Sequence, residues 1–193
     1  MAARLRDAGI SVQTTLVVYE AGLGGVDATA RVLNDPSFAF LTPQTQSLWR
    51  GIADRPRPGF LMQLIEVPPR YAEFTRAIAG SLHRNGVQLL AGTDAMGIPM
   101  IIPGSSLLHE LDLLQQSGLT PYEVIRTATV NPARFLGKEK EFGTITVGKR
   151  ADLILLERNP LDDLSAFNQP VGVMVRGRWL PRESLQKLLS ALN

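Results

Sequence analysis

Residues 87–95, with the sequence VQLLAGTDA, decide the fold class that we predict for this chain. The apolar run at 87–91 predicts a buried strand, and a Gly-Thr-Asp turn at 92–94 closes it. A second run, SVQTTLVVY at residues 11–19, is rich in β-branched types and contains no Gly or Pro, so it also predicts a buried strand. The long, largely helical connection between the two runs requires the strands to be parallel.

Most of the remaining sequence up to residue 137 predicts helices. Apolar residues at 71, 74, 78 and 82 form one stripe and predict a helix over residues 71–84. A second helix is expected from Ser105 or Ser106 as N-cap, with leucines 107, 108, 111 and 114 on its inner face. The sequence TPYE at 120–123 matches a capping box with proline at the first helical position, and its helix is expected to end near Val130, before the Asn131-Pro132 break.

After Gly137 the pattern changes to short strands at the spacing of antiparallel hairpins. We expect these strands at 143–147, 151–157, 171–175 and 178–180, with a last amphipathic helix over 181–192. We therefore predict two regions, a parallel α/β region at 1–137 and an antiparallel region with a terminal helix at 138–193. Because two parallel strands cannot stand alone, more strands are expected beside them. Residues 2–8 predict the last turns of a helix, which favours a chain truncated at its N-terminus.

The composition excludes several classes of function. The chain has 193 residues, 20 Lys and Arg against 18 Asp and Glu, two His and no Cys. A net charge of +2 without a basic run predicts no nucleic-acid partner, and no apolar run approaches the roughly 20 residues of a membrane helix. The lack of cysteine excludes disulfides, iron–sulfur clusters and thiol catalysis without fixing the compartment. Two histidines are too few for a His-rich binuclear metal centre.

Asp94 is the strongest candidate for chemistry because it follows the carboxyl end of a buried strand. In parallel α/β folds, functional sites are built at that rim, where the βα loops converge. A carboxylate there can bind a metal ion or take a proton from water. An aspartate that only caps the loop fits the same position equally well.

The two histidines differ in their expected distance from this rim. His83 is expected near the other end of the strand, roughly 20 Å from Asp94, and therefore as a surface or helix-end residue. His109 falls in the first turn of the helix after the Asp94 loop. It either contacts a substrate there or packs beneath the loop with one ring nitrogen bonded to the backbone. Glu110 is interpreted as a charge at the helix N-terminus that favours the helix dipole.

Other segments near the rim are less specific. We expect residues 20–25 to form a loop, and we interpret Glu20, Asp27 and Glu66 as solvated loop carboxylates. The apolar loop at 96–104 either lines a substrate pocket or packs over the end of the sheet. The sequence contains no His-x-His, His-Glu-x-x-His, Gly-x-Ser-x-Gly or phosphate-binding glycine motif.

A series of motifs in the second half of the chain resembles the metal-dependent amidohydrolase superfamily. The series runs through LLAGTDA (89–95), PGSSLLHEL (103–111), SGLTP (117–121), ATVNPA (128–133), GTI (143–145), GKRADL (148–153) and NPL (159–161). Each motif alone is weak, but together they follow the order and spacing of that superfamily over about residues 87–180. The likeness is strongest for the branch with imidazolonepropionase-like and Xaa-Pro dipeptidase-like enzymes, and residues 1–86 match more loosely.

The resemblance implies a (β/α)₈ TIM-type barrel of which this chain holds the last two strands, followed by antiparallel strands of a small β-sandwich. It implies that Asp94 contacts a divalent metal, with zinc as the expected ion, and acts as general base toward the attacking water. His109 lies in a family-like stretch and is assigned to substrate binding rather than to the metal. The family's His-x-His and its bridging Lys or Glu belong to strands that this sequence does not contain.

Three functions remain open at this point. The chain is a C-terminal fragment of a hydrolase of amide, cyclic amide or dipeptide-like C–N bonds, or a natural half-protein, or a non-catalytic interaction module. The expected partners are a small-molecule substrate and, for the incomplete barrel, either the missing N-terminal half or a second copy of the chain. The fragment hypothesis predicts exposed barrel edges, and hence oligomers or poor solubility.

Overall fold

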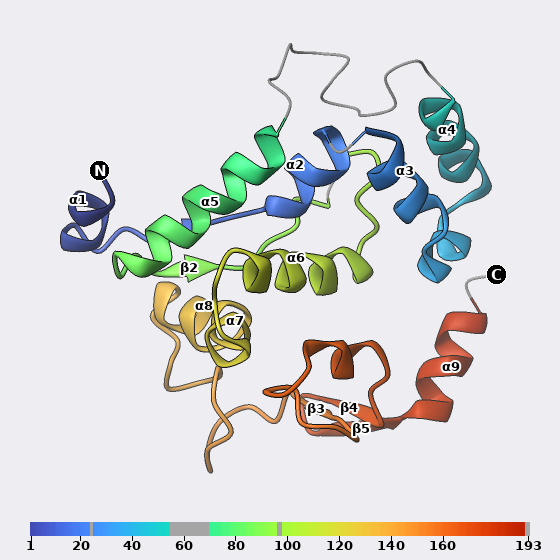
Figure 1. The fold of residues 1–193 in the computed structure, drawn as a ribbon. Coiled ribbons are helices and arrows are strands. Elements are labelled where there is room, and N and C mark those ends of the chain that lie inside the picture. The colour runs from blue at the N-terminus through green and yellow to red at the C-terminus, as the bar shows by residue number, and fades with distance from the viewer. Residues whose placement is uncertain (24, 55–69, 96–97, 192–193) are drawn as a thin grey trace.

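The computed structural model describes residues 1–23, 25–54, 70–95 and 98–191, a mixed α/β arrangement in which helices predominate (Figure 1). The first part of the chain contains α1 (Ala2–Asp7), β1 (Val12–Gln13), α2 (Leu16–Leu23), α3 (Gly25–Leu33), the 3₁₀ helix η1 (Pro36–Phe40), α4 (Pro43–Ala53), α5 (Tyr71–Arg84), β2 (Leu89–Leu90), α6 (Ser105–Gln116), α7 (Pro121–Ala128) and α8 (Val130–Phe135). The second part contains β3 (Leu153–Leu155), the 3₁₀ helix η3 (Leu164–Asn168), β4 (Gly172–Val175), β5 (Arg178–Pro181) and α9 (Arg182–Ser190).

Strands β1 and β2 pair in parallel, with Val12 opposite Leu89 and Gln13 opposite Leu90. This pairing confirms the predicted parallel connection, and β2 lies inside the strand predicted at 87–91. The strand predicted at 11–19 is mostly wrong, because only residues 12–13 are extended. The loop predicted at 20–25 is also wrong, since α2 continues to Leu23.

The end of β1 explains the first of these errors. The backbone of Thr15 turns into the left-handed region, with φ of 45°, and the chain enters α2 at the next residue. The apolar residues that follow are buried among helices instead of in a sheet. A short apolar run fits a buried helix as well as a buried strand, so its pattern could not separate the two.

Three predicted helices are confirmed, with corrections to their ends. Helix α6 begins at Ser105 with Gly104 as N-cap, so a serine cap was the wrong expectation. The capping box of Thr120 and Glu123 at the start of α7 is confirmed by reciprocal hydrogen bonds. The helical path breaks at Thr129 rather than at Asn131-Pro132, since the first turn of a helix tolerates proline.

The buried faces of α5 and α6 also differ from the predicted stripes. On α5, Phe74 and Ile78 are exposed, whereas the buried residues are Ala79, Gly80 and Leu82. A Cβ atom on Gly80 would lie 2.2 Å from the backbone oxygen of Ser117, so α5 and α6 touch at the level of their backbones.

On α6, leucines 111 and 114 are buried as predicted, leucine 107 is exposed and leucine 108 is half-buried. The other buried residues of that helix are Ser106, Glu110 and Leu113.

The hydrophobic core lies among α2, α5, α6 and the segment before α6. Its most deeply buried side chains are Met100, Ile101, Leu113, Leu114 and Val124. Leu164 of η3 belongs to the same cluster, so the second part of the chain packs on the first. Among the described residues, no helix is both long and apolar enough to cross a membrane.

The second part of the chain forms an antiparallel sheet in the order β3-β4-β5. Figure 1 shows these strands gathered at one end of the molecule, below α6, with α9 beside them. The predicted strands at 151–157, 171–175 and 178–180 and the last helix are confirmed in shortened or shifted form. Residues 143–147 are not a strand, and the side chains of Ile145 and Val147 are 88% and 102% exposed. The division at residue 137 into two domains stays a prediction.

Candidate functional site

The carboxyl ends of β1 and β2 meet at one edge of the sheet. A Cβ atom on Gly92 would lie 1.9 Å from Nε2 of Gln13, so the Gln13 side chain packs directly on the backbone of Gly92 and would have to move for any larger residue. Asp94 follows two residues later, is exposed, and has a φ of 50°. The structure thus places Asp94 just past the end of a parallel strand, where the sequence predicted it.

The backbone of Asp94 bears on the two interpretations of this residue. Aspartate tolerates the left-handed region better than most side chains, and such conformations cluster at functional sites. An aspartate that caps a loop accepts hydrogen bonds from backbone N–H groups. Within the described residues, its carboxylate has no hydrogen-bond or ion-pair partner. This favours a carboxylate free to act on a ligand, and its role in catalysis stays a prediction.

The described residues do not by themselves make a metal centre. Across 1–23, 25–54, 70–95 and 98–191, no group of three or more His, Asp or Glu side chains lies close enough to hold a metal ion. Catalytic zinc uses about three protein ligands. Asp94 could supply one ligand, so the predicted metal does not fit the residues of this part of the chain alone.

Glu110 is a buried acid beneath this rim that the sequence analysis misread. Its side chain is fully buried and accepts hydrogen bonds from the Val17 N–H, at 2.9 Å, and from the Thr14 hydroxyl. Val17 lies in the first turn of α2, so Glu110 caps the N-terminus of that helix rather than serving the dipole of its own. Burial raises the pKa of Glu110 to about 7, although the hydrogen bonds from Thr14 and Val17 act to lower it.

His109 belongs to a charged cluster with Glu20 and Arg31. Nε2 of His109 lies 2.5 Å from Oε2 of Glu20, and Nη1 of Arg31 lies 2.9 Å from Oε1 of the same carboxylate. Burial acts to raise the pKa of Glu20, but the hydrogen bonds and charges of His109 and Arg31 outweigh it and lower that pKa to about 2. Because the carboxylate is then ionised, Nε2 of His109 carries the hydrogen and donates it.

These contacts decide several of the sequence interpretations. Glu20 is not a solvated loop carboxylate, because it lies on α2 with a side chain only 16% exposed. His109 uses its ring nitrogen for Glu20 rather than for the backbone, and its assignment to substrate binding stays a prediction. The Asp27 side chain and Glu66 lie outside the described residues.

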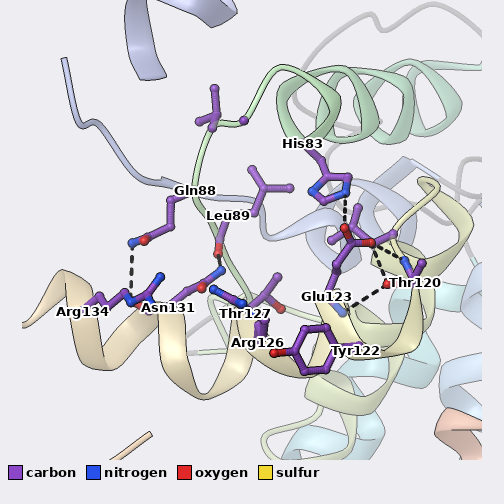
Figure 2. A pocket seen from close by; sticks show the side chains of 13 residues that line it. His83, Gln88, Leu89, Thr120, Tyr122, Glu123, Arg126, Thr127, Asn131 and Arg134 are labelled. Atoms are coloured by element: carbon purple, nitrogen blue, oxygen red, sulfur yellow. Dashed lines mark hydrogen bonds and ion pairs between the residues drawn. The ribbon is translucent and has the colours of Figure 1, made fainter. Parts of the chain in front are cut away.

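His83 lies before the start of β2, whereas Asp94 follows its end. Nε2 of His83 is 3.1 Å from Oε1 of Glu123. The two side chains face each other in a pocket of about 450 Å³ (Figure 2). On the other side of this pocket, Nδ2 of Asn131 donates to the backbone oxygen of Leu89 at 2.9 Å. The Ala91 N–H donates to the Thr127 oxygen at 3.0 Å. Helices α7 and α8 therefore cover the edge of β2 that β1 leaves free.

Comparisons with known proteins agree on one family. A family model described as "Amidohydrolase family" matches residues 68–180. The ochratoxinase of Aspergillus niger is 34% identical over 100 residues, which are 51% of this chain and 19% of the ochratoxinase. The imidazolonepropionase of Streptococcus pyogenes serotype M3 is 29% identical over 153 residues, which are 76% of this chain and 34% of that enzyme.

Solved structures place almost the whole chain within larger molecules. A bottromycin amidohydrolase superposes with a TM-score of 0.70 at 27% identity, over 96% of this chain and 41% of that one. A Xaa-Pro dipeptidase superposes with a TM-score of 0.57 at 19% identity, over 93% of this chain and 42% of that one, which is a likeness of fold alone. The chain thus spans about a fifth to a third of the two curated relatives and about two fifths of these solved chains.

Proposed function

Because the chain belongs to the amidohydrolase family, we propose that it forms the C-terminal part of an enzyme that hydrolyses carbon–nitrogen bonds with activated water. In this proposal β1 and β2 are the last two strands of a (β/α)₈ barrel, and β3–β5 are strands of a small β-sandwich. The substrates are amides, cyclic amides or dipeptide-like compounds. The likeness to an amidohydrolase at 27% identity supports amide chemistry.

One observation carries the proposal. Asp94 stands at the carboxyl end of a parallel strand, inside the segment that matches the family model, with an exposed carboxylate that no described side chain or backbone group engages. Active sites of barrel enzymes lie at that end of the strands. A structural capping role would engage the carboxylate and leave it unavailable.

The proposed chemistry assigns Asp94 two proton transfers. It accepts a proton from the water whose oxygen attacks the carbonyl carbon, and it then delivers that proton to the leaving nitrogen as the C–N bond breaks. The products are a carboxylic acid and an amine, so the atoms of one water are consumed. The divalent metal, with zinc expected, belongs to the complete protein in this proposal, because its other ligands must come from residues beyond those described.

A second candidate function follows from the incomplete sheet. Within the described residues the parallel sheet has two strands, whereas a closed barrel of this type has eight. The side chains of Ile145 and Val147 are exposed in the segment where a strand was predicted and where the structure has none. A natural half-protein, or a non-catalytic module that docks on a partner chain, would use these same surfaces.

The test is hydrolysis by the protein as its gene encodes it, together with any chain that co-purifies with it. Zinc-loaded protein is incubated with N-acyl amino acids, Xaa-Pro dipeptides and cyclic amides, with and without a chelator. Release of the amine, lost with the chelator, is the expected result. Absence of hydrolysis across all three classes by folded, metal-loaded protein would overturn the proposal. The coding sequence upstream of Met1 separates the hypotheses further, because an open frame with a His-x-His motif indicates a longer hydrolase.

A further inference from the structure

A second pocket, with a volume of about 540 Å³, opens between α3, η1, α6 and the end of η3. Its apolar wall includes Val17, Ala21, Met100 and Ile102, and its polar wall includes side chains of α3 and α6. Asp94 does not line it, whereas His109, which the sequence analysis assigned to substrate binding, does. The volume lies within the range of pockets that hold small organic ligands.

The hydroxyl of Ser106 is a buried hydrogen-bonding group at this pocket. The residue is only 6% exposed and lines the pocket from the first turn of α6. Within the described residues, its hydroxyl oxygen has no hydrogen-bond partner. A buried hydroxyl without a partner costs free energy, so such groups are rare unless a water or a ligand completes them. A ligand with a hydrogen-bonding group would remove this cost.

The charges around the pocket favour a cationic ligand. Among the described residues that line the pocket, the two basic side chains, Arg31 and His109, are both already paired with Glu20. Two carboxylates line the pocket without an ion-pair partner in the described residues, Asp35 and Asp112. Asp35 is engaged in capping η1, where it accepts the Ser37 N–H at 2.7 Å.

Asp112 is therefore the carboxylate available to a ligand. Burial, with the negative charge of Asp163, raises the pKa of Asp112 against the opposing effect of His109. A cation next to this carboxylate would oppose the effects of burial and of Asp163, because an opposite charge favours the ionised form.

We propose that this pocket binds a small organic ammonium compound, whose apolar body packs against Met100 and Ile102, whose amine pairs with Asp112 and whose hydroxyl bonds to Ser106. This inference does not depend on the proposed hydrolysis, since Asp94 takes no part in it. It predicts an ordered preference among probes of similar size that differ in charge or in the phenol hydroxyl.

Calorimetric titration of the full chain with four probes tests the proposal. Tyramine carries a phenol and an ammonium group, phenethylamine lacks the phenol, 2-(4-hydroxyphenyl)ethanol lacks the charge, and 3-(4-hydroxyphenyl)propionate reverses it. Tyramine should bind best, phenethylamine about 3- to 10-fold more weakly, the neutral alcohol at least about 10-fold more weakly, and the acid not at all. Equal binding of the acid and the amine, or no saturable binding of tyramine, would overturn the proposal.

Two variants assign the contacts. Ser106→Ala should weaken tyramine about 3- to 10-fold and leave phenethylamine unchanged, because only tyramine carries the hydroxyl. Asp112→Asn should weaken both amines by about 10-fold or more and leave the neutral alcohol nearly unchanged. Asp54→Asn, an exposed carboxylate at the end of α4, is the matched control and should change nothing. Circular dichroism confirms that each variant is folded, and tyramine binding unchanged in folded Ser106→Ala and Asp112→Asn would contradict the assigned site.

Discussion

The carboxylate of Glu110 accepts the backbone N–H of Val17 at 2.9 Å and so caps a helix that lies 93 residues away in the chain. The Thr14 hydroxyl donates to the same carboxylate. Helix α2 begins immediately after the sharp turn at Thr15. The buried acid of α6 therefore fixes where β1 ends and α2 begins.

This relationship predicts a specific dependence of stability on pH. The pKa of Glu110 is about 7 in the folded chain and 4.5 as an ordinary glutamate, so the folded state binds more protons between these values. The free energy of unfolding should therefore fall as the pH rises from about 4.5 to 7, by up to about 3 kcal/mol. Urea unfolding at pH 5 and pH 8 measures it. The Glu110→Gln variant should lose this slope, and an unchanged slope in the variant would show that Glu110 is not its source.

Glu20 predicts a separate effect at lower pH. Its pKa is about 2 in the folded chain, below the ordinary 4.5, so the stability that it contributes is complete above pH 4.5 and is lost as the pH falls toward 2. Glu20→Gln should lower the free energy of unfolding at pH 6 by about 2 kcal/mol. It should also reduce the loss of this free energy as the pH falls from 6 to 3. Glu139→Gln, an exposed control, should do neither. The two curves are compared by urea unfolding between pH 3 and pH 6. If wild type and Glu20→Gln lose the same free energy of unfolding between pH 6 and pH 3, this carboxylate does not have the proposed role.

Two helical glycines should respond in opposite directions to the same substitution. In Gly80→Ala the new Cβ collides with the Ser117 backbone oxygen, so a loss of about 1–3 kcal/mol is expected. In Gly51→Ala nothing lies within 4 Å of the new Cβ, and the lower entropy of the unfolded chain should stabilise by about 0.5–1 kcal/mol. Thermal unfolding distinguishes the two. A stabilising Gly80→Ala would mean that α5 and α6 do not approach this closely.

The edge of β2 offers a fourth test. Asn131→Ala removes the donor to the buried Leu89 oxygen and should cost about 1–3 kcal/mol. Asn34→Ala, at an exposed site, is the matched control and should be nearly neutral. Hydrogen exchange of the Ala91 amide, which donates to the Thr127 oxygen of α7, gives a second readout, because faster exchange is expected when this edge of β2 loses its cover. If the Asn131→Ala chain is as stable as the control, the contact does not hold this edge.

The predictable part of the fold rests on local signals. The capping box of Thr120 and Glu123 and the strand before Gly92 are decided by neighbours in the chain, and both were predicted. Parallel pairing was also predictable, because a long helical crossover is typical of neighbouring parallel strands.

The remaining features rest on contacts between distant segments. Glu110 fits the local rule for an acid near a helix N-terminus. No neighbouring residue in the sequence indicates that it would bind the backbone of Val17, 93 residues earlier. Glu20 is paired with Arg31 and His109, and the contact with His109 joins residues that lie 89 positions apart in the chain. Asp94 was placed correctly because the end of a strand is a local feature, whereas the ligands that would join it are not among the described residues.

The most direct test of the central claim is the turnover of Asp94→Asn in the complete, metal-loaded protein. Asparagine accepts the same left-handed backbone, and the Asp94 side chain makes no hydrogen bond in the described structure, so the melting temperature should stay unchanged. The account predicts that kcat for C–N hydrolysis falls by about 10²- to 10⁴-fold, while the Asp54→Asn control keeps full activity. Near-normal turnover by Asp94→Asn would contradict the proposed role of this carboxylate.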